Sequence, residues 1–225
     1  MQLRADRVSL EGHHGTLLPA TSLNVGEREL AIVHGEPGVG VTAFGLALAG
    51  RLKPSTGTVH AEGTDAQPSE LVAVVDAPGV SEPDEAVQVR VVVGEELALA
   101  HQPASKADVA RWLAEHDAAA FATTRFEKLE PALRTRLLTE LAASRKGVRV
   151  LVLDTPDRHT SKVWTWAGLA REFAGRGFAV VVLTATTPES ALPFPPARIG
   201  ETEQPGPESH AQTEELAASA EGDNA

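Results

Sequence analysis

The sequence predicts an α/β fold built around a mostly parallel sheet. Two nearly continuous aliphatic runs, Val148–Leu153 and Phe178–Leu183, are separated by a helical pattern over Val163–Ala174. Aliphatic runs joined by a helical crossover are typical of parallel strands that are buried on both faces. A third apolar run, Glu29–His34, leads into a glycine-rich loop and then into a helix at Thr42–Gly50. A strand, a glycine-rich loop and a helix in this order are a known unit of α/β folds.

The N-terminal region predicts a small antiparallel β layer beside that sheet. Residues 2–10 alternate loosely and suggest an edge strand, followed by a turn at Gly12–Gly15. A second strand is expected at Leu17–Val25. Further strands are expected at Thr58–Ala61 and Leu71–Val75.

Helical patterns are concentrated in the middle of the chain. They cover Gly94–His101, Ala107–Ala118 and Leu133–Ser144, and the last has leucines at helical spacing. We therefore expect a small helical subdomain at about residues 90–145. The whole fold then occupies residues 1–200 as one domain, which is an ordinary size for a single core.

Composition excludes several classes of protein. The 225 residues include no cysteine, so disulfides and thiolate metal sites are excluded, and a cytosolic location fits. No apolar run approaches the roughly eighteen residues of a membrane span. The first residues have no apolar segment typical of a secretory signal, so we expect none.

The net charge of −11 is unevenly distributed. Residues 201–225 hold seven acidic residues and no Lys or Arg, which leaves 24 acidic and 20 basic residues in the rest of the chain. Neither part carries the basic surface of a nucleic-acid binder, and no nucleic-acid partner is expected. The segment 201–225 is expected to be an acidic disordered tail that aids solubility, or alternatively a docking segment.

The glycine-rich loop matches the phosphate-binding pattern G-x-x-x-x-G-K-[ST] at every fixed position except the lysine, which is Val41. Backbone N–H groups of such a loop converge on phosphate oxygens, and the following helix adds its positive end. Thr42 and the strand-terminal Asp154 are candidate ligands of Mg²⁺. The candidate cofactor-binding residues are Gly35, Gly38, Val39, Gly40, Val41, Thr42 and Asp154.

Each of these assignments has a structural alternative. The glycines could form an inherited turn that no longer meets phosphate. Thr42 could simply cap its helix. Asp154 could be a hydrogen-bonded structural carboxylate.

The order of features from about Leu3 to Ile199 resembles the ATP-binding cassette (ABC) ATPase family. The most specific stretch is Leu48–Val59, which is similar to the segment that follows the phosphate loop in that family. Val91–Leu97 resembles the entry to the family's helical subdomain, and Leu151–Asp157 resembles its Walker B segment. The resemblance implies ATP and Mg²⁺ as cofactors.

Carrying the family's working residues over one at a time predicts a loss of catalysis. The phosphate-loop lysine is replaced by Val41, and the glutamate that polarises the attacking water is replaced by Thr155. A threonine hydroxyl cannot act as a general base near neutral pH. The switch histidine is replaced by Ala185, and Asp76 falls near the position of the glutamine that links the nucleotide to the helical subdomain.

The family's signature loop aligns best with Leu129–Leu133. Its serine and glycine amides normally grip the γ-phosphate across a dimer. In this sequence Glu130 would repel the phosphate, and Pro131 removes a backbone donor. A symmetric dimer that encloses ATP is therefore not expected.

These losses predict a degenerate ABC transporter subunit, with weak ATP binding and impaired or absent hydrolysis. By resemblance it would support a polytopic membrane protein from the cytoplasmic face of the cell membrane, as a homodimer or with another ABC subunit. A second hypothesis is an active hydrolase that uses Asp157, Asp76 or a partner's residues. A third is a soluble interaction scaffold without nucleotide.

Overall fold

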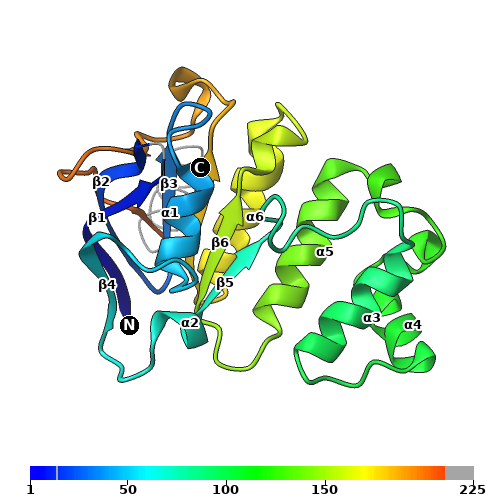
Figure 1. Cartoon of the computed structure of the whole chain (residues 1–225). Coiled ribbons are helices and arrows are strands. Elements are labelled where there is room, and N and C mark those ends of the chain that lie inside the picture. The colour runs from blue at the N-terminus through cyan, green and yellow to red at the C-terminus, as the bar shows by residue number, and fades with distance from the viewer. Residues whose placement is uncertain (14, 211–225) are drawn as a thin grey trace, which may run out of the picture.

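The computed structural model describes residues 1–13 and 15–210, and it has the predicted α/β architecture. An antiparallel sheet and helix α1 (Val41–Leu48) lie on one side of a mostly parallel sheet, and α6 (Val163–Gly175) lies on the other (Figure 1). Helices α3 (Val89–Leu99) and α4 (Lys106–Glu115) lie at the far end of the molecule from the antiparallel sheet (Figure 1). Helix α5 (Pro131–Ala143) lies between them and the parallel sheet (Figure 1). Within the described residues, no helix is long and apolar enough to cross a membrane.

The antiparallel sheet has the strand order β2-β1-β4. Its strands are β1 (Gln2–Gly12), β2 (Gly15–Gly26) and β4 (Thr56–Glu62). The prediction that residues 2–10 form an edge strand was wrong, because β1 pairs with β2 on one side and with β4 on the other. The loose alternation has a local cause, since pairing shifts register near Arg7, which has a φ of 45°.

The larger sheet has the order β5-β6-β7-β3-β8, and β9 also pairs with β3. Its strands are β3 (Glu29–His34), β5 (Val72–Val75), β6 (Val150–Asp154), β7 (Ala179–Thr184), β8 (Ala197–Arg198) and β9 (Glu208–Ser209). All pairs among β5, β6, β7 and β3 are parallel, as the aliphatic runs predicted. The carboxyl ends of these strands therefore lie at one edge of the sheet, where ligands bind in open α/β sheets.

Alternation of side chains along the parallel strands divides the core in two. Leu30 and Ile32 of β3 pack with buried residues of α3, α5 and α6, whereas Ala31 and Val33 pack with α1 and the antiparallel sheet. Each strand thus buries both of its faces, which explains why its sequence is aliphatic throughout.

The helices are α1 (Val41–Leu48), α2 (Pro68–Leu71), α3 (Val89–Leu99), α4 (Lys106–Glu115), α5 (Pro131–Ala143) and α6 (Val163–Gly175). The short α2 was not predicted. Helix α3 begins five residues before the predicted Gly94, because Val89, Val92 and Val93 are buried on its inner face. The run of valines in this segment is equally compatible with a strand, so its helical state is set by packing.

The C-terminal region is ordered beyond residue 200. Residues Glu208 and Ser209 form β9 on the edge of β3, and Arg171 of α6 donates two hydrogen bonds to the Glu208 carboxylate at 2.6 and 2.8 Å. The expected tail therefore does not begin at Glu201. The remainder of that expectation, residues 211–225, lies outside the described residues.

Candidate functional site

The predicted phosphate loop connects the carboxyl end of β3 to the start of α1 (Figure 1). Its backbone requires glycine at Gly40, where φ is 92° and an added Cβ would lie 2.2 Å from the carbonyl oxygen of Leu17. Gly38 also has a positive φ, of 89°, but no atom lies within 4 Å of a Cβ built there. The Gly40 position is thus fixed by close packing on β2, and Gly38 leaves open space above the loop.

Val41 lies where the pattern has its lysine, and it is part of the core. Only 6% of its surface is exposed, and it packs among the buried residues of α1 and the antiparallel sheet. A Cβ built on Gly35 would lie 2.9 Å from both Val39 and Val41 and 2.8 Å from Ile199. The base of the loop is therefore apolar, and no cation from this position points toward a bound anion.

No side chain among the described residues caps the start of α1. Its N-cap is Gly40, and no acidic residue lies in the first turn. The first N–H groups of a helix have no partner inside the helix, so they attract an anion. These N–H groups at the start of α1 are therefore available to an anion.

Thr42 and Asp154 are brought together as predicted. The Thr42 hydroxyl donates a hydrogen bond of 3.1 Å to Asp154 Oδ1, and Asp154 ends β6 with 1% of its surface exposed. Burial raises the pKa of Asp154 to about 6, despite hydrogen bonds from Thr42 and Thr155 that act to lower it. Its Oδ2 atom is buried without a hydrogen-bond partner among the described residues. An unpaired buried carboxylate oxygen beside a hydroxyl suits a hard cation such as Mg²⁺.

Thr155 follows Asp154 and adopts a strained backbone. Its φ is 44°, a left-handed conformation that β-branched residues rarely adopt. Its N–H donates to the carbonyl of Leu183, and Arg158 Nη1 donates to its hydroxyl at 3.3 Å. The chain thus makes a sharp turn directly after Asp154, and Thr155 supplies no carboxylate there.

Ala185 sits after β7 in a loop that is held by Asp157. The Asp157 Oδ2 atom accepts hydrogen bonds from the Ala185, Thr186 and Thr187 amides and from the hydroxyls of Thr184 and Thr186. Burial acts to raise the pKa of Asp157, yet these hydrogen bonds together hold it below its ordinary value. Asp157 therefore has a structural task in this loop.

Asp76 directly follows β5 and lies at the centre of a buried network of ion pairs. Arg134 of α5 donates two hydrogen bonds to its carboxylate at 2.9 and 2.8 Å, and both side chains are almost fully buried. Arg158 and His159 also contact this carboxylate, at 3.2 and 3.1 Å. Burial acts to raise the pKa of Asp76, but these partners hold it below its ordinary value.

This network was missed by sequence reasoning, although one signal for it was present. Arg134 precedes three buried leucines of α5, Leu137, Leu138 and Leu141, by three, four and seven residues. That spacing places the arginine on the buried face of the helix. A charge at such a position requires a buried partner, and only the fold shows that the partner is Asp76.

The segment aligned with the signature loop lies at the start of α5. Glu130 is exposed and is the N-cap residue of the helix, and Pro131 is its first residue. Proline is favoured at this position because its missing N–H would have no partner there. Pro131 has no backbone N–H to offer an anion, and the carboxylate of Glu130 would repel one.

Comparisons with known proteins find similar solved structures but no similar family model or curated sequence. No protein-family model and no curated protein matches the sequence. Among solved structures, a nucleotide-free ATP-binding cassette from an ABC transporter has a TM-score of 0.58 and 16% identity, covering 83% of this chain and 82% of that one. An ATP-binding subunit of an ABC transporter has a TM-score of 0.56 and 16% sequence identity, and the match covers 83% of this chain and 80% of that one. A putative ABC transporter ATP-binding protein from Pyrococcus furiosus has a TM-score of 0.62 and 15% sequence identity, and the match covers 88% of this chain and 96% of that one.

These likenesses extend over most of each chain, at sequence identities that report on the fold alone. The chain has the fold of an ABC transporter ATP-binding cassette.

Proposed function

We propose that this chain is a degenerate ATP-binding cassette that binds ATP with Mg²⁺ weakly and does not hydrolyse it at a useful rate. The observation that carries the proposal is the contrast at the strand ends. Asp154, Thr42 and the uncapped start of α1 keep the features that receive a metal-bound phosphate. Val41 stands where the family has its phosphate-binding lysine, and Thr155 stands where the family has its general base.

The residues present fit the phosphate and the metal better than they fit the reaction. The buried Oδ2 atom of Asp154 has no protein partner among the described residues, and a divalent cation would supply one. The base of the loop is filled by Val39, Val41 and Ile199. One missing charge-assisted contact corresponds to about 1.5–3 kcal/mol, or about a tenfold to hundredfold loss of affinity. Weak binding is the expected result.

The alternative of a hydrolase with substitute residues is poorly supported by the site. Asp76 and Asp157 were its candidate bases, and burial acts to raise the pKa of each. Hydrogen bonds hold the pKa of Asp157 below its ordinary value, and hydrogen bonds together with the charges of Arg158 and Arg134 do so for Asp76. The Asp76 carboxylate is engaged by Arg134 and His159. A carboxylate held in this way is a poor acceptor of a proton from water near neutral pH.

The proposed cellular role follows the family resemblance. The chain would act at the inner face of the cell membrane as a structural or regulatory partner of a polytopic transport or export protein. It would pair with a second copy or with another ABC subunit. Copurification with a membrane protein would support this role and would contradict a free soluble scaffold.

Phosphate release from the purified chain tests the loss of catalysis. Wild type should release phosphate from ATP and Mg²⁺ at the background rate, and Thr155→Glu should be the variant most able to gain turnover. Fast release by wild type would contradict the proposal. A Thr155→Gln variant controls for side-chain size without supplying a base.

Restoring the cation tests the binding claim. Val41→Lys should lower the dissociation constant for ATP about tenfold to a hundredfold, because it returns one charge-assisted contact. Val41→Met is the matched control, since it adds a side chain of similar length without charge. Isothermal titration measures both, and circular dichroism verifies that each variant is folded. Equal affinity of the two variants would show that no phosphate lies at this position.

A further inference from the structure

One arginine, Arg158, holds its guanidinium at the carboxyl edge of the parallel sheet. It ends the short 3-10 helix Pro156–Arg158, which follows β6. Its Nη1 atom donates a hydrogen bond of 2.7 Å to the carbonyl oxygen of Asp154 and one of 3.3 Å to the hydroxyl of Thr155. Its Nη2 atom donates one of 2.6 Å to the carbonyl oxygen of Asp76, directly after β5. The guanidinium therefore bridges the carboxyl ends of β5 and β6.

These contacts fix Arg158 in place and leave its charge only partly neutralised. The three hydrogen bonds described above end on uncharged oxygens. The Asp76 carboxylate lies 3.2 Å from Nη2, but both of its oxygens already accept hydrogen bonds from Arg134. The other acidic contact is Glu82, at 3.1 Å, and 27% of its side chain is exposed. A carboxylate open to water can turn into solvent at little cost, which would free Nη2 for another anion.

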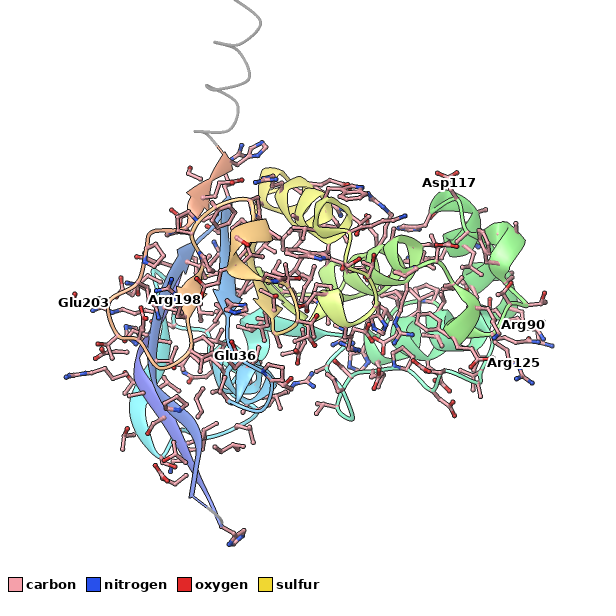
Figure 2. All side chains as sticks on the ribbon, turned by 90° about the horizontal axis from the view of Figure 1, so that it is seen from above. Glu36, Arg90, Asp117, Arg125, Arg198 and Glu203 are labelled. Carbon is pink, nitrogen blue, oxygen red and sulfur yellow. The ribbon has the colours of Figure 1, made fainter. Side chains whose placement is uncertain are left out.

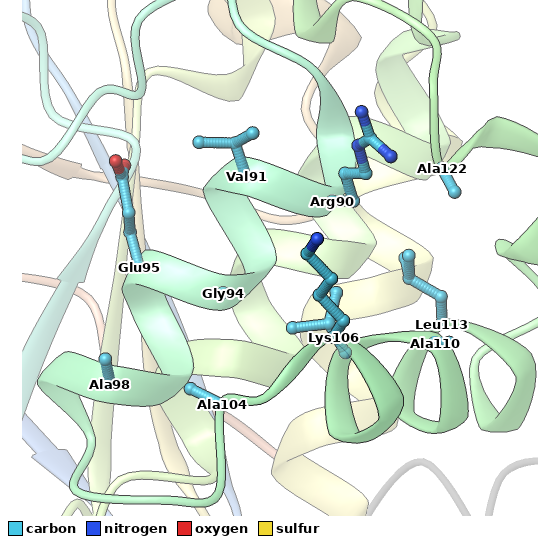
Figure 3. Close-up of a pocket in the computed structure, with 11 residues that line it drawn as sticks. Arg90, Val91, Gly94, Glu95, Ala98, Ala104, Lys106, Ala110, Leu113 and Ala122 are labelled. Carbon is cyan, nitrogen blue, oxygen red and sulfur yellow. The ribbon is translucent and has the colours of Figure 1, made fainter.

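Basic residues elsewhere on the molecule are poorly placed to replace the missing lysine. Arg90 and Lys106 line a pocket between α3 and α4 (Figure 3). Figure 2 shows Arg90 at the end of the molecule formed by these helices, whereas Glu36 of the phosphate loop lies beside α1. Arg198 of β8 donates two hydrogen bonds of 2.8 Å to the Glu189 carboxylate. Arg158, by contrast, contacts the residues at both the predicted metal position and the predicted base position.

The charge of Arg158 also reaches the candidate metal ligand. Burial raises the pKa of Asp154, hydrogen bonds from Thr42 and Thr155 act to lower it, and the positive charge of Arg158 acts in the same direction. Only 20% of the Arg158 side chain is exposed, and a charge that is partly shielded from water acts more strongly on its neighbours. In the family that the chain resembles, a glutamate occupies the position of Thr155. The local charge at this position has therefore changed from negative to positive.

We propose that Arg158 binds the terminal phosphate of a bound nucleoside triphosphate and so selects ATP over ADP. This inference rests on the proposed function, and it adds the residue that supplies part of the charge lost at Val41. A planar guanidinium presents paired N–H donors that match two oxygens of a phosphate. An arginine stays protonated near neutral pH, so it stabilises the bound triphosphate but cannot take a proton from water. Retention of intact ATP is the consequence.

The ratio of ATP affinity to ADP affinity tests this assignment. In isothermal titration with Mg²⁺ present, wild type should bind ATP more tightly than ADP. Arg158→Gln should weaken ATP binding about tenfold to a hundredfold, because one charge-assisted contact is lost, and should leave ADP binding nearly unchanged. Arg158→Lys keeps the charge without the fork and should retain part of the preference for ATP. The same changes in the Val41→Lys background keep the weaker complexes within the measurable range.

Matched measurements separate phosphate binding from a structural role. Arg136→Gln removes an arginine that pairs with the exposed Glu172, and it should leave both affinities unchanged. Circular dichroism and thermal unfolding verify that each variant is folded. A purely structural Arg158 would weaken ATP and ADP alike on substitution, and that result would overturn the assignment, as would equal wild-type affinity for the two nucleotides. Binding of neither nucleotide by wild type would instead overturn the proposed function, and this inference with it.

Discussion

At the scale of single residues, Asp154 is the group whose environment most directly calls for a ligand. It is buried, its pKa is raised to about 6, and one of its oxygens has no partner among the described residues. This oxygen is therefore the candidate ligand of the proposed Mg²⁺.

The raised pKa of Asp154 predicts a pH dependence of stability. The folded protein binds a proton at this site up to about pH 6, whereas the unfolded chain loses it near the ordinary aspartate value of 3.8. The free energy of unfolding should therefore fall as pH rises from about 4 to 6, by up to about 3 kcal/mol from this group. Asp154→Asn should remove that part of the fall, as urea unfolding measured from pH 4 to pH 8 would show.

Magnesium provides the companion measurement. At pH 7.5, Mg²⁺ should raise the melting temperature of wild type and leave that of Asp154→Asn unchanged, because only the carboxylate binds the ion. A pH-independent difference between the two proteins, with no response to Mg²⁺ in either, would identify Asp154 as an ordinary structural carboxylate.

The positions of several candidate residues were predictable because they depend on local sequence patterns. The glycines of the loop, Thr42 and Asp154 are recognised by their spacing around a strand and a helix. The burial of Val41 depends on tertiary contacts, and the positive φ of Thr155 depends on backbone geometry. Neither can be read from the spacing of residues in the sequence.

At the scale of elements, the phosphate loop separates two glycines that look alike in sequence. Both have a positive φ, but a side chain at Gly40 would collide with the backbone of β2, and one at Gly38 would meet open space. Gly40→Ala should lower the free energy of unfolding by about 2–4 kcal/mol, from strain and overpacking. Gly38→Ala should cost only about 1 kcal/mol, from strain. Chemical denaturation of both variants compares them, and equal losses would contradict the packing account.

The Asp76–Arg134 pair joins α5 to the core sheet near the candidate site. Removing one member leaves the other as a buried unpaired charge, so Arg134→Met should cost about 3–5 kcal/mol of unfolding free energy. The matched control is Arg136→Met on the same helix, which breaks an exposed pair with Glu172 and should cost less than about 1 kcal/mol.

A double-mutant cycle isolates the pair itself. Asp76→Asn combined with Arg134→Met should destabilise the protein by less than the sum of the two single changes, because neither partner then remains charged. Additive losses would indicate that the two residues act independently. Unfolding by urea at constant pH is the measurement.

Elements with long apolar runs were predicted closely, and those set by tertiary contacts were not. The predicted Glu29–His34 coincides with β3 because a buried parallel strand is aliphatic along its whole length. The position of β1 in the middle of its sheet required knowledge of β4, a strand more than forty residues later in the chain. Likewise β9 owes its place to the exposed edge of β3 and to Arg171, which no local pattern reveals.

At the scale of the whole molecule, the chain has the fold of an ATP-binding cassette, whereas the proposed function lacks ATP hydrolysis. The layered sheet, α1 and the helices α3–α5 give the architecture of an ATP-binding cassette over most of the chain (Figure 1). The two hydrogen bonds from Arg134 to Asp76 join α5 to the end of β5.

The most direct test of this account follows the fate of bound nucleotide. The purified chain is incubated with radiolabelled ATP and Mg²⁺, separated from free nucleotide, and its bound nucleotide is identified by chromatography. The account predicts Mg²⁺-dependent retention of nucleotide that is still ATP after hours. Steady conversion to ADP and phosphate by the wild-type chain alone would contradict it.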